Sequence, residues 1–384
     1  MNNESVLTPI YADNAATTKI GPAALRAMTA ACEDAFANPS SPHTPGQRAA
    51  RALWDARERI AACIGASPRE IVFTSGGTES DNAAVFSAAL RDRNKKHIVS
   101  TVIEHHAVLK PLEFLSKRGF EIELLPVGAD GIVSPESVRR AIRPDTALVS
   151  VMSANNEIGT VQPIREIGEI CRAAGAPFHT DAVQAVGHIP VSVKDMNADL
   201  LSASAHKFHG PRGVGFLYVR QGTELRGLLG GGQERGRRAG TENLPGIVGM
   251  AAALEEAVSS MEKNNARLAA LRDKIIGGIL SAVPRSSLNG DRERRLANNI
   301  NVMVEGANAE AMILLLDDAG IAVSSGAACA SGAGELSRVL TAIGLTEENA
   351  RCCLRITPGE DLTQAQAEYI ISSVARAAER LRGV

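Results

Sequence analysis

The sequence lacks the features of disulfide-bonded, zinc-binding and membrane-spanning proteins. Its 384 residues include six cysteines, but these form no CxxC pair and no regularly spaced framework, so neither a secreted disulfide scaffold nor a common zinc site is predicted. No apolar run reaches the roughly 18 residues that a spanning helix needs. The formal net charge is only −2, which gives no electrostatic reason to expect direct binding of nucleic acid or of an anionic membrane.

A secretory leader is also absent from the first residues. The segment MNNESVLTPIYADN has no basic region followed by an apolar one, which is the pattern that such leaders share. Together with cysteines that form no framework, this predicts a protein of a reducing compartment. We therefore expect a cytoplasmic protein with no membrane partner.

What the sequence does contain is a regular alternation of short apolar runs and helical patterns, over about residues 48–260. Helical spacing of apolar residues is seen, for example, over 79–93 and 164–175. The runs predicted to be strands are 70–75, 97–102, 120–127, 146–152, 177–183, 199–204 and 213–219. This alternation predicts an α/β fold around a mainly parallel, buried sheet.

A second, smaller unit is predicted in the last third of the chain. A long helical stretch over roughly 245–282 leads out of the first unit, and strand-like and helical segments then alternate again. The last segment, 364–381, repeats apolar residues at helical spacing on one face. We predict a large domain over 15–260, and a small α/β domain formed by 1–14 together with 261–384.

One lysine, Lys207, has an unusual setting in SASAHKFHGPRG (202–213). The apolar run DLLSAS (199–204) precedes it, so the lysine lies at the end of a buried strand. Loss of hydration there favours the neutral amine, which is the form that makes a Schiff base. A lysine in water at a loop edge is the alternative, and the motifs around it decide between the two.

Polar residues follow several of the other predicted strands, at the sheet edge where α/β proteins bind ligands. TSGGTES (74–80) leads into a helix, and its glycines and helix N-terminus suit an anion. It lacks the Lys-Ser or Lys-Thr of a nucleotide-binding loop. EHHAV, SANNEIG and TDAVQ follow three further strands. Their histidines match no common zinc spacing, so we predict no metal site.

Pyridoxal 5'-phosphate accounts for this set of residues. The cofactor needs a lysine, a carboxylate against its ring nitrogen, an anion-binding turn for its phosphate and a planar group over its ring. Lys207, Asp181, the turn at 77–78 and His105 supply one of each at successive strand ends. Each match is weak alone, but the four together predict a pyridoxal-phosphate site.

The sequence resembles the cysteine desulfurases of the NifS/IscS type, which belong to the class V aminotransferase-like group. The resemblance runs nearly from end to end and implies the aminotransferase-like fold of type I, with a seven-stranded sheet. The motifs that carry it are YADNAATT (11–18), NPSSPH (38–43), FTSGGTESDN (73–82), EHHAVL (104–109), ANNEIGTVQPI (154–164), HTDAVQA (179–185), SAHKFHGPRGVG (204–215), GGGQERGRRAGTEN (230–243) and SSGAACASG (324–332).

The resemblance implies a role for each matching residue. Lys207 would hold the cofactor, Asp181 would face the ring nitrogen and His105 would stack on the ring. The other implied cofactor contacts are Gln184, Gly77, Thr78, Ser204, His206, Thr241 and Asn156. Thr241 would reach the phosphate from the other subunit, which implies a homodimer. The residues implied to bind the substrate are Arg355, Asn156 and Asn14.

Cys329 is implied as the second active residue. Its flanks, SSGAA and ASGAGE, predict a flexible loop rather than a packed strand. In the implied reaction L-cysteine becomes L-alanine: Lys207 removes the α-proton, His105 exchanges protons near the thiol, and the Cys329 thiolate accepts the sulfur as a persulfide. An acceptor protein would take this sulfur for iron–sulfur cluster assembly, tRNA thiolation or DNA phosphorothioation.

Two other functions are compatible with parts of this pattern. A selenocysteine lyase, or another class V enzyme, would share the cofactor site, and a persulfide trapped on Cys329 would distinguish a desulfurase from it. A catalytically silent scaffold that only binds partner proteins would not need Lys207, Asp181 and Cys329, all of which are present.

Overall fold

A seven-stranded sheet forms the centre of the larger part of the molecule. The computed structural model describes residues 9–92, 94–226, 228–325 and 336–383, and within them the strand order is β2-β8-β7-β6-β5-β3-β4. The strands are β2 (Ile71–Thr74), β3 (His97–Thr101), β4 (Glu121–Leu125), β5 (Thr146–Ser150), β6 (Phe178–Asp181), β7 (Leu200–Ser204) and β8 (Gly215–Val219). Only β8 runs antiparallel to its neighbours, β2 and β7, which confirms the mainly parallel α/β fold.

Helices cover both faces of this sheet, so its strands are apolar on both sides. Neighbouring residues of one strand enter different clusters: Phe73 packs in the cluster that includes residues of α2 and α7, and Val72 packs with residues of α3 and α4. This follows from the two-residue period of a strand. The covering helices are α1 (Pro22–Asp34), α2 (Thr44–Cys63), α3 (Gly77–Arg91), α4 (His106–Ser116), α5 (Pro135–Ala141) and α6 (Ile164–Ala174).

The C-terminal part has its own small sheets and its own apolar cluster. β10 (Ile300–Val304) lies between β9 (Ser286–Leu288) and β12 (Cys353–Ile356), antiparallel to both. β1 (Ile10–Tyr11) pairs in parallel with β11 (Ile321–Ala322), so the N-terminal segment lies beside a strand from the far end of the chain. The helices are α8 (Ala309–Asp318), α9 (Arg338–Ala342), α10 (Glu347–Ala350) and α11 (Gln364–Arg382).

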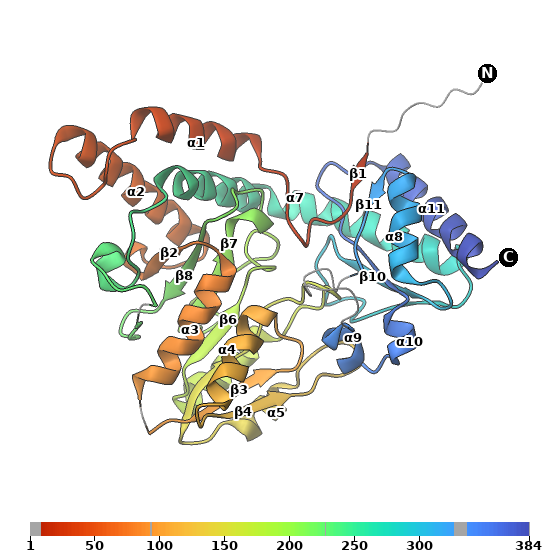
Figure 1. Cartoon of the computed structure of the whole chain (residues 1–384), viewed down its shortest axis with the longest axis horizontal. Helices are drawn as coiled ribbons and strands as arrows, with labels where there is room; N and C mark the ends of the chain where they lie inside the picture. Colours follow the sequence, from red (N-terminus) through yellow and green to blue (C-terminus); the bar gives the residue numbers. More distant parts are fainter. Residues whose placement is uncertain (1–8, 93, 227, 326–335, 384) are drawn as a thin grey trace.

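One long helix, α7 (Leu244–Ala282), connects the two parts (Figure 1). It packs against α1 and α2 near the large sheet and against α11 near the small sheets. Leu254 belongs to the large cluster, whereas Ile275 belongs to the C-terminal cluster. The domain boundaries at 14/15 and 260/261 stay a prediction. Among the described helices, none is both long and apolar enough to span a bilayer.

Candidate active site

A pocket opens where the ends of β5, β6 and β7 meet the start of α3 and α4. Ten of the residues singled out in the sequence line it, which brings them together from positions 77 to 355. They are Gly77, Thr78, His105, Asn156, Asp181, Gln184, Ser204, His206, Lys207 and Arg355. For the residues that follow β5, β6 and β7 the convergence follows from the fold, because the carboxyl ends of parallel strands share one edge of the sheet.

Lys207 ends a short 3₁₀ helix (Ala205–Lys207) that directly follows β7. Its half-buried amine donates to the carbonyl oxygen of Ala15 at 2.7 Å and to that of Ala16 at 2.8 Å. The amide of Gln184 donates to the same Ala15 oxygen at 2.9 Å. The N-terminal segment therefore holds the lysine amine inside the pocket, next to Gln184.

Asp181 and His105 lie close together in the pocket that Lys207 also lines. Asp181 ends β6 and accepts the backbone N–H of Val183 at 2.9 Å. Its burial raises the pKa of its carboxyl, while His105 and Lys207 oppose that rise. The ring of His105 caps α4, where Nδ1 accepts the N–H of Ala107 at 3.1 Å. Burial lowers the pKa of His105, so the neutral ring carries its proton on Nε2.

The start of α3 forms the anion-binding side of the pocket. Gly77 and Thr78 are its first residues, and unpaired N–H groups at a helix N-terminus attract a phosphate. A Cβ on Gly77 would stand 2.6 Å from Cγ2 of Val183, so only glycine fits against this neighbour. Ser204 closes the same side, and Nδ1 of His206 lies 3.1 Å from the Thr17 hydroxyl.

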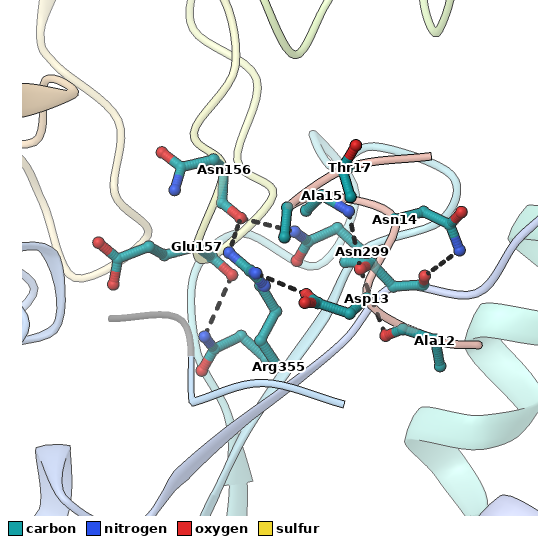
Figure 2. A network of polar contacts seen from close by, with 12 residues as sticks. Ala12, Asp13, Asn14, Ala15, Thr17, Asn156, Glu157, Asn299 and Arg355 are labelled. Carbon is teal, nitrogen blue, oxygen red and sulfur yellow. Dashed lines mark hydrogen bonds and ion pairs between the residues drawn. The ribbon is translucent and has the colours of Figure 1, made fainter. Parts of the chain in front are cut away.

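Arg355 lies on β12 and reaches the pocket from the C-terminal part (Figure 2). Its Nη2 is 2.7 Å from Oδ1 of Asp13. Nη1 donates to the carbonyl oxygen of Asn156 at 3.1 Å. Nε is buried and has no hydrogen-bond partner among the described residues. A guanidinium that is held at two nitrogens and lines the pocket suits a carboxylate ligand.

Two predicted site residues do not line this pocket. Asn14 borders a small neighbouring cavity, and its side-chain amide donates to the carbonyl oxygen of Thr357 at 2.8 Å. Thr241 is exposed on the surface of the single chain. The segment before Thr241 is fixed to α3 and α2, because Arg238 Nε lies 2.8 Å from Oε1 of Glu79 on α3, and Glu234 pairs with buried Arg57 on α2.

Cys329 lies outside the described residues. The residues that flank its segment are described, and both contact the surroundings of Arg355. The backbone of Ser324 forms a bridge with that of Arg355. The hydroxyl of Ser337 donates to Oε2 of Glu157 at 2.5 Å. The described cysteines are free, and they are Cys32, Cys63, Cys171, Cys352 and Cys353.

Sequence reasoning missed three acidic residues at the site: Asp13, Asp81 and Glu104. Each stands inside a quoted motif, but nothing in the motif shows that its side chain is turned inward. Asp81 lines the pocket, and its carboxyl, that of Asp181 and the His105 ring have donor atoms within 4.8 Å of one another. Such a group can hold a metal ion; that this site holds none stays a prediction. Glu104 is buried, which raises the pKa of its carboxyl to about 8.

The pocket fits pyridoxal phosphate. It offers a lysine amine, a buried carboxylate held by one N–H, a histidine ring beside that carboxylate and a helix N-terminus that lacks a Cβ where an anion would approach. These are the four features that the cofactor requires. Lys207, Asp181, His105 and the turn at 77–78 would supply them in that order.

Comparison with known proteins agrees with this chemistry. Residues 10–366 match the model of the class V aminotransferases. The chain is 48% identical to the cysteine desulfurase IscS of Methanosarcina thermophila over 377 residues, which are 98% of this chain and 93% of that protein. The structure of a NifS-like protein superposes with a TM-score of 0.90 at 36% identity, covering 96% of this chain and 99% of that one.

A second solved structure, of SspA in complex with cysteine, has a TM-score of 0.80 at 39% identity and covers 91% of this chain and 98% of that chain. Class V aminotransferases use pyridoxal phosphate as their cofactor. The family match, the near full-length identity and the geometry of the pocket agree with one another. The chain belongs to the class V aminotransferase family and, within it, to the cysteine desulfurases.

Proposed function

We propose that this protein removes the sulfur of L-cysteine, releases L-alanine and carries the sulfur as a persulfide on Cys329 until an acceptor protein takes it. The observation that supports this most directly is the meeting of Lys207, Asp181 and Arg355 in one pocket. The pocket thus combines an amine and a carboxylate suited to the cofactor with a guanidinium suited to an amino-acid carboxylate.

The residues bind the cofactor and the substrate in two adjoining regions. Lys207 holds the cofactor covalently, Asp181 faces its ring nitrogen and His105 covers its ring. The remaining cofactor contacts are Gln184, Asn156, Gly77, Thr78, Ser204 and His206. Arg355 and Asn156 hold the carboxylate of L-cysteine, and Asn14 supports them from the side through Thr357. The structure of SspA, a relative, contains cysteine, which agrees with this substrate.

The proton and sulfur steps are assigned to three residues. Bound pyridoxal phosphate supplies an electron sink for the bonds that break at the substrate. Lys207 removes the proton from Cα, and His105 exchanges a proton at Nε2 with the substrate thiol. The Cys329 thiolate attacks the substrate sulfur, so that an S–S bond forms and the C–S bond breaks. The electron pair of the broken C–S bond stays on Cβ, and Cβ takes up a proton to become the methyl group of alanine.

The working unit is a homodimer in this proposal. Thr241 does not line the pocket of its own chain, and it follows a segment that Glu234 and Arg238 fix to α2 and α3. Such an exposed, anchored threonine is suited to reach the phosphate of a partner subunit. The reaction is placed in the cytoplasm, a reducing compartment, because the cysteines of the sequence form no CxxC pair and no disulfide framework.

The test uses the purified protein with its cofactor and L-cysteine, in the presence of a thiol reductant that releases the sulfur. The expected products are L-alanine and sulfide in equal amounts. Lys207→Ala should form neither, whereas Lys194→Ala, which removes an exposed lysine nearby, should behave as wild type. A protein that holds the cofactor but releases no alanine from L-cysteine would overturn the proposal.

A further inference from the structure

Asp81 is a buried carboxyl for which neither the fold nor the proposed reaction has an obvious use. It stands in the second turn of α3, lines the active-site pocket and is 1% exposed. Its Oδ1 has no hydrogen-bond partner among the described residues. A carboxylate in such a place loses its hydration and gains little in return.

Among the described residues, no cation balances a charge on Asp81. The nearest ring nitrogen, Nε2 of His179, is 3.6 Å from Oδ1. Burial lowers the pKa of His179 to about 3, so this ring is neutral. Its two nitrogens lie 2.8 Å from the Ser150 hydroxyl and 3.0 Å from the Ser202 hydroxyl. The acidic groups that face Asp81 are Asp181 on β6 and Glu104 after β3; the Ser202 hydroxyl on β7 favours the charged form of Asp81, but burial and the charge of Asp181 oppose it more strongly.

Asp181 is in a different position, although it is almost as deeply buried. The N–H of Val183 donates to its carboxylate, and both Lys207 and His105 favour its charged form. Two carboxyls that share one buried site do not both ionise, and the one with fewer partners keeps the proton. Here the proton belongs to Asp81, and Asp181 is the carboxylate.

We infer that Asp81 is a neutral carboxylic acid whose O–H donates a hydrogen bond to the Asp181 carboxylate and keeps it ionised. Asp81 is then a positioning residue, which acts on the cofactor through Asp181. Burial, followed by the charge of Asp181, raises the pKa of Asp81, and the hydrogen bond between the two carboxyls lowers the pKa of Asp181. The effect of Asp81 on the reaction rests on the proposed function, in which Asp181 faces the cofactor's ring nitrogen.

Infrared difference spectroscopy of the holoenzyme tests the protonation state directly. A protonated carboxyl and a carboxylate absorb at different frequencies, so wild type minus Asp81→Asn should show a protonated carboxyl band at neutral pH. The difference between wild type and Asp181→Asn should instead show a carboxylate band. A carboxylate band for Asp81 would overturn the inference, whether or not the protein makes alanine from L-cysteine.

The acid side of the pH profile of kcat tests the hydrogen bond. In Asp81→Leu, Asp181 loses a donor, so its pKa should rise and the acid side should move to higher pH by roughly one unit. Asp81→Asn keeps a donor, an amide N–H, so its acid side should stay where wild type has it. A shift to lower pH in both variants would mean that Asp81 carries a charge, and an unshifted profile in Asp81→Leu would mean a purely structural role. Either result contradicts the inference.

Discussion

The guanidinium of Arg355 and the carboxylate of Asp13 form an ion pair inside the molecule, with 2.7 Å between Nη2 and Oδ1. The Arg355 side chain is 3% exposed and that of Asp13 is 21% exposed. Asn156 accepts a second N–H of the same guanidinium through its carbonyl oxygen. Because these contacts limit the rotation of a long side chain, little further ordering is needed when a carboxylate binds.

Replacing Arg355 by alanine should weaken substrate binding and leave the cofactor in place. Loss of a charge-assisted contact of about 2–3 kcal/mol corresponds to a rise in KM for L-cysteine of roughly 30- to 150-fold. Steady-state kinetics and the visible spectrum of the bound cofactor measure the two effects. Arg351→Ala, which removes an exposed arginine four positions earlier, is the matched control. An unchanged KM in Arg355→Ala would remove Arg355 from the substrate site.

The contact between Gly77 and Val183 predicts a defect in cofactor binding. Gly77→Ala places a Cβ 2.6 Å from Val183 Cγ2, which has to shift the start of α3 or the segment after Asp181. We expect the Kd for pyridoxal phosphate to rise at least about tenfold, the equivalent of 1.4 kcal/mol. Absorbance titration of the cofactor-free protein measures it.

Val183→Ala in the same chain should restore part of this affinity, because it removes the methyl group that clashes. Gly277→Ala is the control, since a Cβ there meets nothing within 4 Å and a helical alanine is favourable. If Gly77→Ala binds the cofactor as tightly as wild type does, the start of α3 is not the phosphate site.

The exposed position of Thr241 predicts that two different inactive chains can complement each other. A mixed dimer of Thr241→Ala and Lys207→Ala chains contains one pocket with both an intact lysine and an intact threonine. Once subunits exchange, the mixture should recover alanine formation, up to roughly a quarter of the wild-type value for random pairing at equal amounts.

The experiment requires that Thr241→Ala alone be severely impaired and that subunit exchange be measured separately, for example with differently labelled chains. Mixing each variant with itself gives the baseline. Exchange without any recovered activity would show that Thr241 does not complete the partner's pocket.

The buried carboxyl of Glu104 should make the free energy of unfolding depend on pH, and the substitution Glu104→Gln should abolish this dependence. Burial raises its pKa to about 8, although Thr101 and Met152 donate to Oε1 at 2.7 Å and 2.9 Å. The folded protein therefore binds more protons here than the unfolded chain does, between the unfolded pKa of about 4.3 and the folded value. This contribution to stability is fully present below pH 4.3 and is lost as the pH rises to 8.

The side chain in Glu104→Gln cannot ionise. The free energy of unfolding of this variant, minus that of wild type, should therefore increase by roughly 3–5 kcal/mol between pH 4 and pH 8. Urea unfolding of both proteins across this range measures the difference. A difference that does not change with pH would show that Glu104 is ionised at its ordinary pKa.

The large sheet and the pocket residues that follow its strands were predictable from short-range patterns, whereas Arg355, on β12, was expected only from the resemblance to a known family. Buried parallel strands appear as apolar runs, and one edge of such a sheet collects whatever follows each strand. The contacts of Asp13 with Arg355 and of Asp81 with Asp181 were not predictable. The first joins residues 342 positions apart, and it depends on β1 pairing with β11 and on Asp13 bridging to Thr357.

The second contact depends on which way one helical side chain faces, which a charged letter in a polar motif does not reveal. Thr241 and Asn14 were expected at the site from their motifs, but they do not line the pocket. Their motifs match the family, yet a single chain does not place either one in the pocket. The role proposed for Thr241 needs a partner subunit, and in the single chain the Asn14 side chain donates to the carbonyl oxygen of Thr357.

In the proposed reaction, cofactor chemistry and sulfur transfer are carried by separate parts of the chain, with Cys329 as the sulfur acceptor. Cys329→Ser tests it most directly, since a hydroxyl is a far poorer nucleophile towards sulfur than a thiolate. The variant should keep the spectrum of the bound cofactor and still change colour when L-cysteine is added, because no described pocket residue is altered. Peptide mass mapping after one turnover should find the added sulfur on Cys329 in wild type and on no cysteine in the variant, with little alanine formed. Full alanine formation by Cys329→Ser, or added sulfur on another cysteine of the wild-type protein, would show that Cys329 is not the sulfur acceptor.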